Sequence, residues 1–190
     1  MAETKPFETP EPYGPWQIKS KSDVYNDPYI DVRLDQVIRP DGDDGQHVVV
    51  GMKPGVCVIA MDEEQNVYLT EEFHYGVGRN SLEGVSGGIE AGEDPDETAR
   101  RELQEEIGMQ AACWQYLTTT DPFTTIVVSP TRLYFATDLT PVESSPEGTE
   151  QIRVVKMPLT EAIEKVYAGE ITHSPTCMLL LMADRRTTDK

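Results

Sequence analysis

The chain has 190 residues, 38% of them hydrophobic, which suits one globular domain with a small appendage and is too short for two full-sized domains. Its 16 Lys and Arg residues face 34 Asp and Glu residues, and the formal charge of -18 argues against binding to nucleic acid or to an anionic membrane surface. A polyanionic substrate would therefore need cations to accompany it.

The three cysteines, Cys57, Cys113 and Cys177, are widely spaced and form no CxxC pair, so neither a disulfide framework nor a zinc site is expected. The N-terminal stretch lacks the apolar segment of a signal peptide, and the longest apolar run, residues 177–183, is far too short to cross a bilayer. We therefore expect a soluble protein of the cytoplasm.

Residues 1–50 form the first part of the predicted organisation. Prolines at positions 6, 10, 12 and 15 predict that the first fifteen residues form an irregular or mobile leader. From residue 16 to about residue 50, short segments of strand character are separated by the Asp- and Gly-rich turn at residues 39–45. We expect a small antiparallel sheet here.

Residues 51–190 form the second part, which begins with a predicted strand pair at residues 55–61 and 66–70. A helix follows over residues 95–107, because Asp94 is a good N-cap, Pro95 suits the first helical position and Gly108 is a C-terminal stop. Glu97 is placed to complete a capping box with Asp94.

The rest of the chain predicts strands at residues 133–139 and 152–157 and helices at residues 159–168 and from 175 to about 185. Strands and helices mix without a regular βαβ alternation. This pattern favours an α+β layered sandwich over a doubly wound parallel sheet.

The helix at residues 95–107 carries an unusual group of acids. Glu102, Glu105 and Glu106 lie at helical spacing beside its apolar stripe, and like charges this close destabilise an exposed helix by some tenths of a kcal/mol per pair. A divalent cation would reverse that effect, and Mg²⁺ prefers oxygen ligands of this kind. The alternative is an ordinary solvated acidic helix face.

The surroundings of these acids favour the metal site. Gly87, five residues, Glu93, seven residues and then the segment 101–109 satisfy every constrained position of the Nudix box, so the chain resembles the Nudix hydrolase superfamily. Gly87 and Gly88 let the backbone approach a phosphate, and Arg101 can pair with Glu93 or Glu105.

The resemblance implies an α/β/α sandwich with a mixed sheet, preceded by a small N-terminal antiparallel sheet. It also implies a bound Mg²⁺, with Mn²⁺ as an alternative. In this family the first and last glutamates of the REUxEE segment are typical metal ligands, which are Glu102 and Glu106 here, with Glu105 close by. The carry-over adds the main-chain carbonyl of Ser86 as a further ligand.

Outside the box, residues 16–181 resemble the ADP-ribose pyrophosphatase branch, which acts on nucleoside-diphosphate sugars. The similarity rests on residues 67–75 and on residues 81–83 before the box. It implies cleavage of ADP-ribose to AMP and ribose 5-phosphate by a homodimer whose N-terminal sheet serves dimerisation and base binding. No nucleic acid or membrane partner is expected.

Two departures from this branch fall where substrate is bound. His74 stands where the branch has Arg, so it is either a weaker, titratable substrate contact or a surface residue. Thr131 precedes Arg132 where the branch often has Glu before Arg. The residues expected to contact substrate are His74, Glu83, Gly87, Gly88 and Arg132.

A proton acceptor for the attacking water is expected in the loop before residues 152–157. Glu150 matches best, also as a metal ligand, and Glu147 is second. Glu105, Arg101 and Glu93 complete the predicted catalytic group. The alternatives are hydrolysis of a UDP-sugar, a dinucleoside polyphosphate or an oxidised nucleotide, and a noncatalytic nucleotide-sugar sensor.

Overall fold

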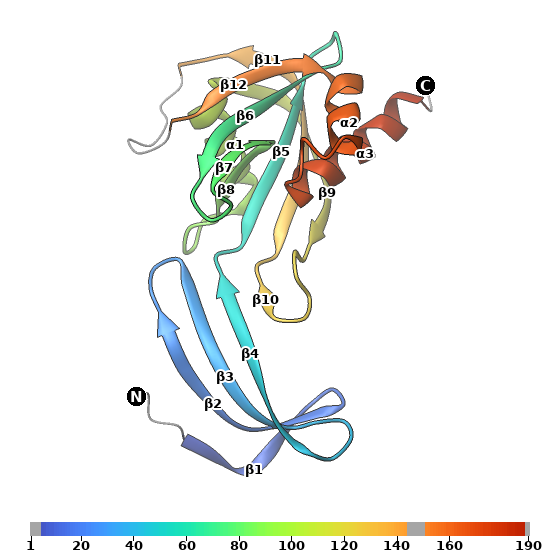
Figure 1. Cartoon of the computed structure of the whole chain (residues 1–190). Coiled ribbons are helices and arrows are strands. Elements are labelled where there is room, and N and C mark those ends of the chain that lie inside the picture. The colour runs from blue at the N-terminus through green and yellow to red at the C-terminus, as the bar shows by residue number, and fades with distance from the viewer. Residues whose placement is uncertain (1–4, 144–150, 189–190) are drawn as a thin grey trace. The chain divides into compact units, whose positions relative to one another are not determined.

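In the computed structural model of the protein, which describes residues 5–143 and 151–188, the chain divides into two compact units (Figure 1). The first, unit 1, comprises Met1–Lys53 together with Asp121–Pro130. The second, unit 2, comprises Pro54–Thr120 and Thr131–Lys190. The first unit is therefore assembled from two separate stretches of the chain.

Unit 1 is a five-stranded sheet in the order β1-β2-β3-β4-β10. Its strands are antiparallel except that β10 runs parallel to β4; their bounds are Lys5–Tyr13 (β1), Trp16–Asn26 (β2), Ile30–Ile38 (β3), Asp44–Met52 (β4) and Val127–Val128 (β10). The predicted turn between β3 and β4 is confirmed: Arg39 N–H donates to the Asp43 carbonyl at 2.8 Å, and Gly42 takes a φ of 92°.

The prediction of an irregular leader was wrong, because most of it is strand β1. Proline has no N–H to donate to a neighbouring strand, and it is therefore confined to sheet edges, strand starts and bulges. β1 lies at the edge of its sheet, and its register with β2 shifts between Pro6 and Glu11. At a sheet edge and at a bulge, the N–H that proline lacks is not needed for pairing, so the strand tolerates its prolines.

Unit 2 contains a mixed sheet in the order β12-β6-β5-β11-β9, with β7 also paired to β6 and β8 to β5. The pairing of β11 with β5 is parallel and the others are antiparallel. The strand bounds are Gly55–Met61 (β5), Asn66–His74 (β6), Arg79–Glu83 (β7), Val85–Gly88 (β8), Met109–Thr120 (β9), Thr131–Pro141 (β11) and Arg153–Pro158 (β12).

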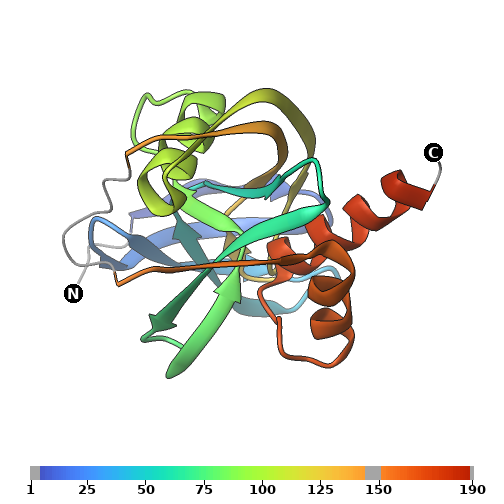
Figure 2. The same ribbon diagram turned by 90° about the horizontal axis from the view of Figure 1, so that it is seen from above.

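Three helices cover the two faces of this sheet: α1 (Pro95–Ile107) on one side, and α2 (Leu159–Tyr167) and α3 (Ser174–Thr188) on the other (Figure 2). Alternate residues of β5 serve the two cores. Val56 and Val58 pack with Leu103 of α1, whereas Cys57 and Ile59 belong to the cluster that includes α2 and α3. The α+β sandwich predicted from the sequence is confirmed.

The ends of α1 follow the predicted signals with one difference. Asp94 accepts a hydrogen bond from Asp96 N–H at 2.9 Å, and Gly108 closes the helix in a left-handed conformation at φ 63°. Glu97 does not complete a capping box, because its carboxylate accepts from Arg100 at 3.0 Å. None of the three helices described here is long and apolar enough to cross a membrane.

The Asp94 cap provides a test of helix stability. We expect Asp94→Ala to lower the free energy of unfolding by about 1 kcal/mol, because the side chain no longer accepts the N–H at the start of α1. Asp94→Ser is the matched control and should retain most of the stability. The measurement is urea denaturation followed by circular dichroism, and equal stability of Asp94→Ala and the natural protein would contradict the assignment.

Candidate active site

The segment that resembles the Nudix box is the candidate catalytic motif, a strand, loop and helix unit formed by β8, the turn at residues 89–94 and α1. In the turn, Glu93 N–H donates to the Glu90 carbonyl at 2.9 Å and Gly92 takes a φ of 85°, which favours glycine. Across the unit, a methyl group at Gly87 would overlap the Glu102 carboxylate. Glycine at position 87 therefore lets a helix carboxylate rest directly against the backbone of β8.

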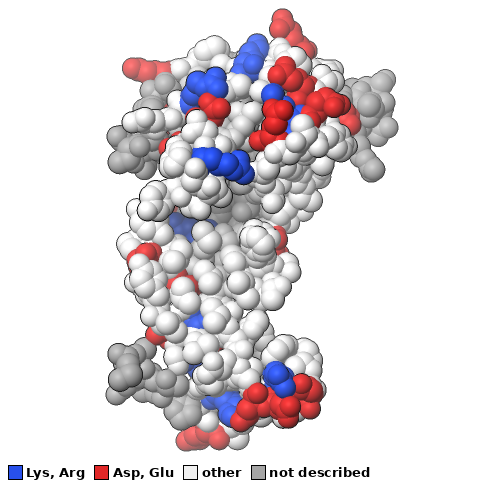
Figure 3. Space-filling model, in the orientation of Figure 1, with Lys and Arg blue, Asp and Glu red and all other residues white. Residues whose placement is uncertain are grey.

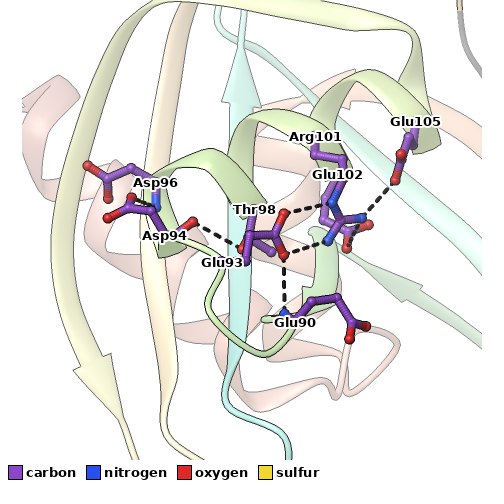
Figure 4. Close-up of polar contacts among 8 residues, drawn as sticks. All are labelled: Glu90, Glu93, Asp94, Asp96, Thr98, Arg101, Glu102 and Glu105. Carbon is purple, nitrogen blue, oxygen red and sulfur yellow. Dashed lines mark hydrogen bonds and ion pairs between the residues drawn. The ribbon is translucent and has the colours of Figure 1, made fainter.

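Arg101 is the centre of the polar network in this motif (Figure 4). Its Nε and Nη2 donate to the two oxygens of Glu93 at 2.9 and 3.2 Å, and its Nη1 donates to Glu105 Oε2 at 2.8 Å. The same Nη1 lies 2.8 Å from Glu102 Oε1. A bidentate pair of this kind fixes the plane of the guanidinium as well as its position. Both predicted partners, Glu93 and Glu105, are in contact with Arg101.

These ion pairs shift the titration of the motif. The hydrogen bonds from Arg101 lower the pKa of Glu93 from its ordinary 4.5 to about 2. Reciprocally, the bond to Glu93 raises the pKa of Arg101, and the bond to Glu105 adds to this effect. The pair of Glu93 and Arg101 is therefore charged at neutral pH.

The three acids of α1 differ in burial and in their neighbours, and both Glu102 and Glu105 contact Arg101. Glu102 and Glu106 are one helical turn apart, so they share a face of α1, and Glu106 is the more buried with a relative exposure of 9%. Glu105 is tied to Arg101. Ser86 lies on β8, opposite Cys57 of β5, and its hydroxyl donates to the Gly84 carbonyl at 2.7 Å.

The donors at this site suit a hard divalent cation. They are carboxylate oxygens, and several carboxylates share the single positive charge of Arg101, so negative charge remains to be neutralised. Gly87 leaves the space that Glu102 occupies. Among the described side chains, no three of His, Cys, Asp and Glu are already gathered as a metal cluster. Glu102 and Glu105 are instead paired with Arg101.

His74 and Glu83, predicted as substrate contacts, are in contact with each other. His74 Nε2 lies 3.2 Å from Glu83 Oε1, and a second histidine, His173, lies with Nδ1 3.2 Å from Glu83 Oε2. His74 is partly exposed and Glu83 is mostly buried. Burial lowers the pKa of His173, while Glu83 opposes that effect. No local pattern could indicate the contact of His173 with Glu83, because the two residues are ninety positions apart along the chain.

Arg132 lies on β11 in register with Val56 of β5, which in turn pairs with Gly87 of β8. Directly paired residues share a face of a sheet, so Arg132 is on the α1 side, as Gly87 is. Its exposed guanidinium lies 5.6 Å from the centre of the Tyr116 ring. The structure therefore brings Arg132 to the same face as the catalytic motif. Gly88 pairs with Gly55 at the end of β8.

The predicted proton acceptors, Glu147 and Glu150, lie outside the described residues. Contacts that the sequence reasoning missed include the turn at Glu90, the histidine at 173 and the hydroxyl of Thr176, which accepts from Gly84 N–H at 2.7 Å. Only the turn could have been found locally, from Gly92 and its neighbours.

Several acidic residues outside this motif pair with basic ones. On the face drawn in Figure 3, Asp and Glu side chains gather with Lys and Arg beside them, while wide areas carry neither kind. At the turn between β3 and β4, for example, Arg39 pairs with both Asp41 and Asp43. The charge of -18 is therefore unevenly spread.

Comparison with known proteins agrees with this geometry. A family model described as "NUDIX domain" matches residues 51–176. The chain belongs to the Nudix family. It is a pyrophosphohydrolase by that membership, as the sequence predicted. A second model, described as "Nucleoside diphosphate sugar hydrolase N-terminal domain", matches residues 16–50 of this Nudix protein.

Similar proteins point to the same group. The Nudix chain is 35% identical to an ADP-ribose pyrophosphatase of Mycobacterium tuberculosis over 147 residues, covering 75% of this chain and 70% of the relative. It is 26% identical to an ADP-ribose pyrophosphatase of Bacillus subtilis, covering 83% and 86%. A crystal structure of an ADP compounds hydrolase has the same fold, with a TM-score of 0.76 at 20% identity over 90% of this chain and 94% of that one.

The ion pair between Glu93 and Arg101 predicts how stability changes with acid. The pKa of Glu93 is about 2 in the folded protein and 4.5 ordinarily. The charged carboxylate therefore stabilises the folded state above pH 4.5, and this stabilisation is lost as the pH falls from 4.5 towards 2. We expect Glu93→Gln to lower the melting temperature at neutral pH, with the difference from the natural protein narrowing as the pH falls from about 6 to about 3.5.

Melting curves by circular dichroism across that range test this expectation. Glu97→Gln is the control, because its ion pair with Arg100 is exposed and contributes little. A difference between Glu93→Gln and the natural protein that stays constant over the whole range would show that Glu93 acts without its charge.

Proposed function

We propose that this Nudix protein catalyses the Mg²⁺-dependent hydrolysis of the diphosphate bond of a nucleoside-diphosphate sugar, with ADP-ribose cleaved to AMP and ribose 5-phosphate. The observation that carries the proposal is the acidic network of α1 set against the glycines of β8. The two ADP-ribose pyrophosphatases among the relatives, and the N-terminal match to a nucleoside diphosphate sugar hydrolase domain, support this substrate class.

Glu102 and Glu106, with the main-chain carbonyl of Ser86 and with Glu105 close by, are the residues that would hold the metal. Bound Mg²⁺ supplies a water of lowered pKa and neutralises charge on the phosphate oxygens. The contact between Arg101 and Glu93 fixes α1 relative to the preceding turn. Glu102, and Glu106 on the same face of α1, therefore stay on the side of the helix that faces β8. The family resemblance also admits Mn²⁺ at this site.

Substrate binding falls to residues around the same face. The backbone of Gly87 and Gly88 approaches the diphosphate, since neither residue carries a side chain of its own. Arg132 offers a positive charge to a phosphate. His74, held by Glu83, takes the place of the arginine of related enzymes.

Proton transfer in this proposal falls to the loop before β12. Water attacks one phosphorus, the bridging P–O bond breaks, and Glu150, or Glu147 as second choice, accepts the proton of the water. AMP leaves with the new oxygen or with the bridging one, according to which phosphorus is attacked. Either route gives the same two products.

Unit 1 in this proposal binds the base and the partner subunit of a homodimer in the cytoplasm. It contains a groove of about 650 Å³ within its own sheet, where the Trp16 ring stacks on His47 with centroids 5.7 Å apart. Aromatic faces of this kind suit a nucleobase. The free thiols of Cys57, Cys113 and Cys177 are consistent with a reducing compartment.

A substrate panel tests the proposed reaction. The protein with Mg²⁺ is incubated with ADP-ribose, UDP-glucose, GDP-mannose, NADH, diadenosine polyphosphates and nucleoside triphosphates, and the products are separated by chromatography. We expect ADP-ribose to give AMP, with activity abolished by chelation and lowered at least about 100-fold in Glu106→Gln, because a metal ligand is lost. Tight binding without turnover of any member would instead favour a sensor.

A second test addresses the proton acceptor. We expect the double change of Glu147 and Glu150 to Gln to lower kcat by about 100-fold or more with little change in melting temperature, because general-base catalysis is lost. The two single variants identify which carboxylate carries the effect, and Glu143→Gln is the control. Unchanged turnover in the double variant would exclude both residues.

A further inference from the structure

Gly84 joins β7 to β8 and is held by close contacts with β5 and by hydrogen bonds of its carbonyl and its N–H. A Cβ atom here would lie 2.9 Å from the Val58 carbonyl oxygen and 3.2 Å from Cys57 Sγ, so the residue is pressed against β5. Its carbonyl accepts from the Ser86 hydroxyl at 2.7 Å. Its N–H, which has no strand partner to bond, donates to Thr176 Oγ1 at 2.7 Å. The chain segment that leads to the metal-binding backbone is thus held by one side chain of α3.

Thr176 is completely buried, so water cannot reach the Gly84 N–H, and the Thr176 hydroxyl is the acceptor that satisfies it. Its hydroxyl oxygen also lies 2.8 Å from His173 Nδ1 and 3.8 Å from Cys57 Sγ. Burial raises the pKa of Cys57 to about 12, so the thiol stays neutral beside it. The Thr176 hydroxyl thus has three polar neighbours, Gly84 N–H, His173 Nδ1 and Cys57 Sγ, which favour one orientation of the hydroxyl.

His173 extends the cluster to the residue before Gly84. Its Nδ1 lies between Thr176 Oγ1 at 2.8 Å and Glu83 Oε2 at 3.2 Å. A proton on Nδ1 suits both neighbours, because the Glu83 carboxylate can only accept. Glu83 is held on its other oxygen by His74. His173, just before α3, and Thr176, in its first turn, therefore hold the side chain of Glu83 and the backbone of Gly84 together.

We propose that Thr176, through Gly84, positions the Ser86–Gly87 backbone for metal binding, and that His173, through Glu83, positions the pair of Glu83 and His74 for substrate binding, so that the start of α3 and the residue before it are working parts of the hydrolase site. The proposal rests on the proposed function, since it concerns the same Mg²⁺ site. Thr176 touches neither metal nor substrate in this role. It acts through Gly84, two residues before the Ser86 carbonyl and three before the glycine that faces Glu102.

The test is the isosteric change Thr176→Val, which keeps the shape and removes the hydroxyl. Partners that orient metal ligands typically contribute 10–100-fold to metal affinity or activity. We expect Mg²⁺ affinity, measured by calorimetry without substrate, to fall about 10-fold or more, and kcat to fall with it, while KM for ADP-ribose at saturating Mg²⁺ changes much less. Thr176→Ser, which keeps the hydroxyl, should restore both quantities.

Thr172→Val is the matched control on the same segment. Its hydroxyl accepts from the exposed Arg79 at 2.8 Å, away from Gly84, and its loss should leave Mg²⁺ affinity and kcat unchanged. Should Thr176→Val fail to fold, His173→Leu tests the same cluster through Glu83, and should raise KM and weaken Mg²⁺ binding. Melting temperatures identify folding failures.

The outcomes separate the two proposals. One outcome is that the natural protein binds Mg²⁺ and hydrolyses a sugar nucleotide, and that Thr176→Val, or His173→Leu in its place, has the same Mg²⁺ affinity and kcat. In that case the positioning role is wrong and the proposed function stands. If the natural protein neither binds Mg²⁺ nor hydrolyses any member of the panel, both proposals fail. Loss of Mg²⁺ affinity in Thr176→Val with recovery in Thr176→Ser supports the positioning role.

Discussion

Arg101 places one positive charge among Glu93, Glu102 and Glu105, and the order of the catalytic motif depends on this ion pair network. Without it, carboxylates one helical turn apart on α1 would repel each other and favour fraying of the helix. The bidentate contact with Glu93 also ties the helix to the turn before it. One side chain therefore sets both the direction of the helix acids and the path of the loop.

The strands and helices below the motif hold it rigidly. β5 contributes alternate side chains to two cores, with Val58 on the α1 side and Ile59 on the side of α2 and α3. The motif rests on a strand and a helix packed on the first of these cores, while Thr176 reaches Gly84 from the second. Sites supported by regular elements on both sides keep their geometry better than sites built on loops alone.

Features set by near neighbours in the sequence could be predicted, and features set by distant ones could not. The limits of α1 follow from Asp94 and Gly108, and the partners of Arg101 lie within eight residues of it. The bond from Gly84 to Thr176 spans 92 residues, and no local pattern indicates it. The strand β1 was missed because prolines usually mark irregular chain, and only its position at a sheet edge explains them.

Unit 1 requires the short segment Asp121–Pro130 in addition to the N-terminal residues. Strand β10 in this segment pairs with β4, and Val50 N–H donates to the Ile126 carbonyl at 2.7 Å. During synthesis on the ribosome, domains usually fold from the N-terminus as they emerge. Here the N-terminal sheet lacks its last strand until β5 to β9 of the catalytic unit have also been made. Unit 1 can therefore be completed only after much of unit 2 has been synthesised. A cut after Lys53 would leave the N-terminal piece without β10 and would leave the segment Asp121–Pro130 of unit 1 attached to unit 2.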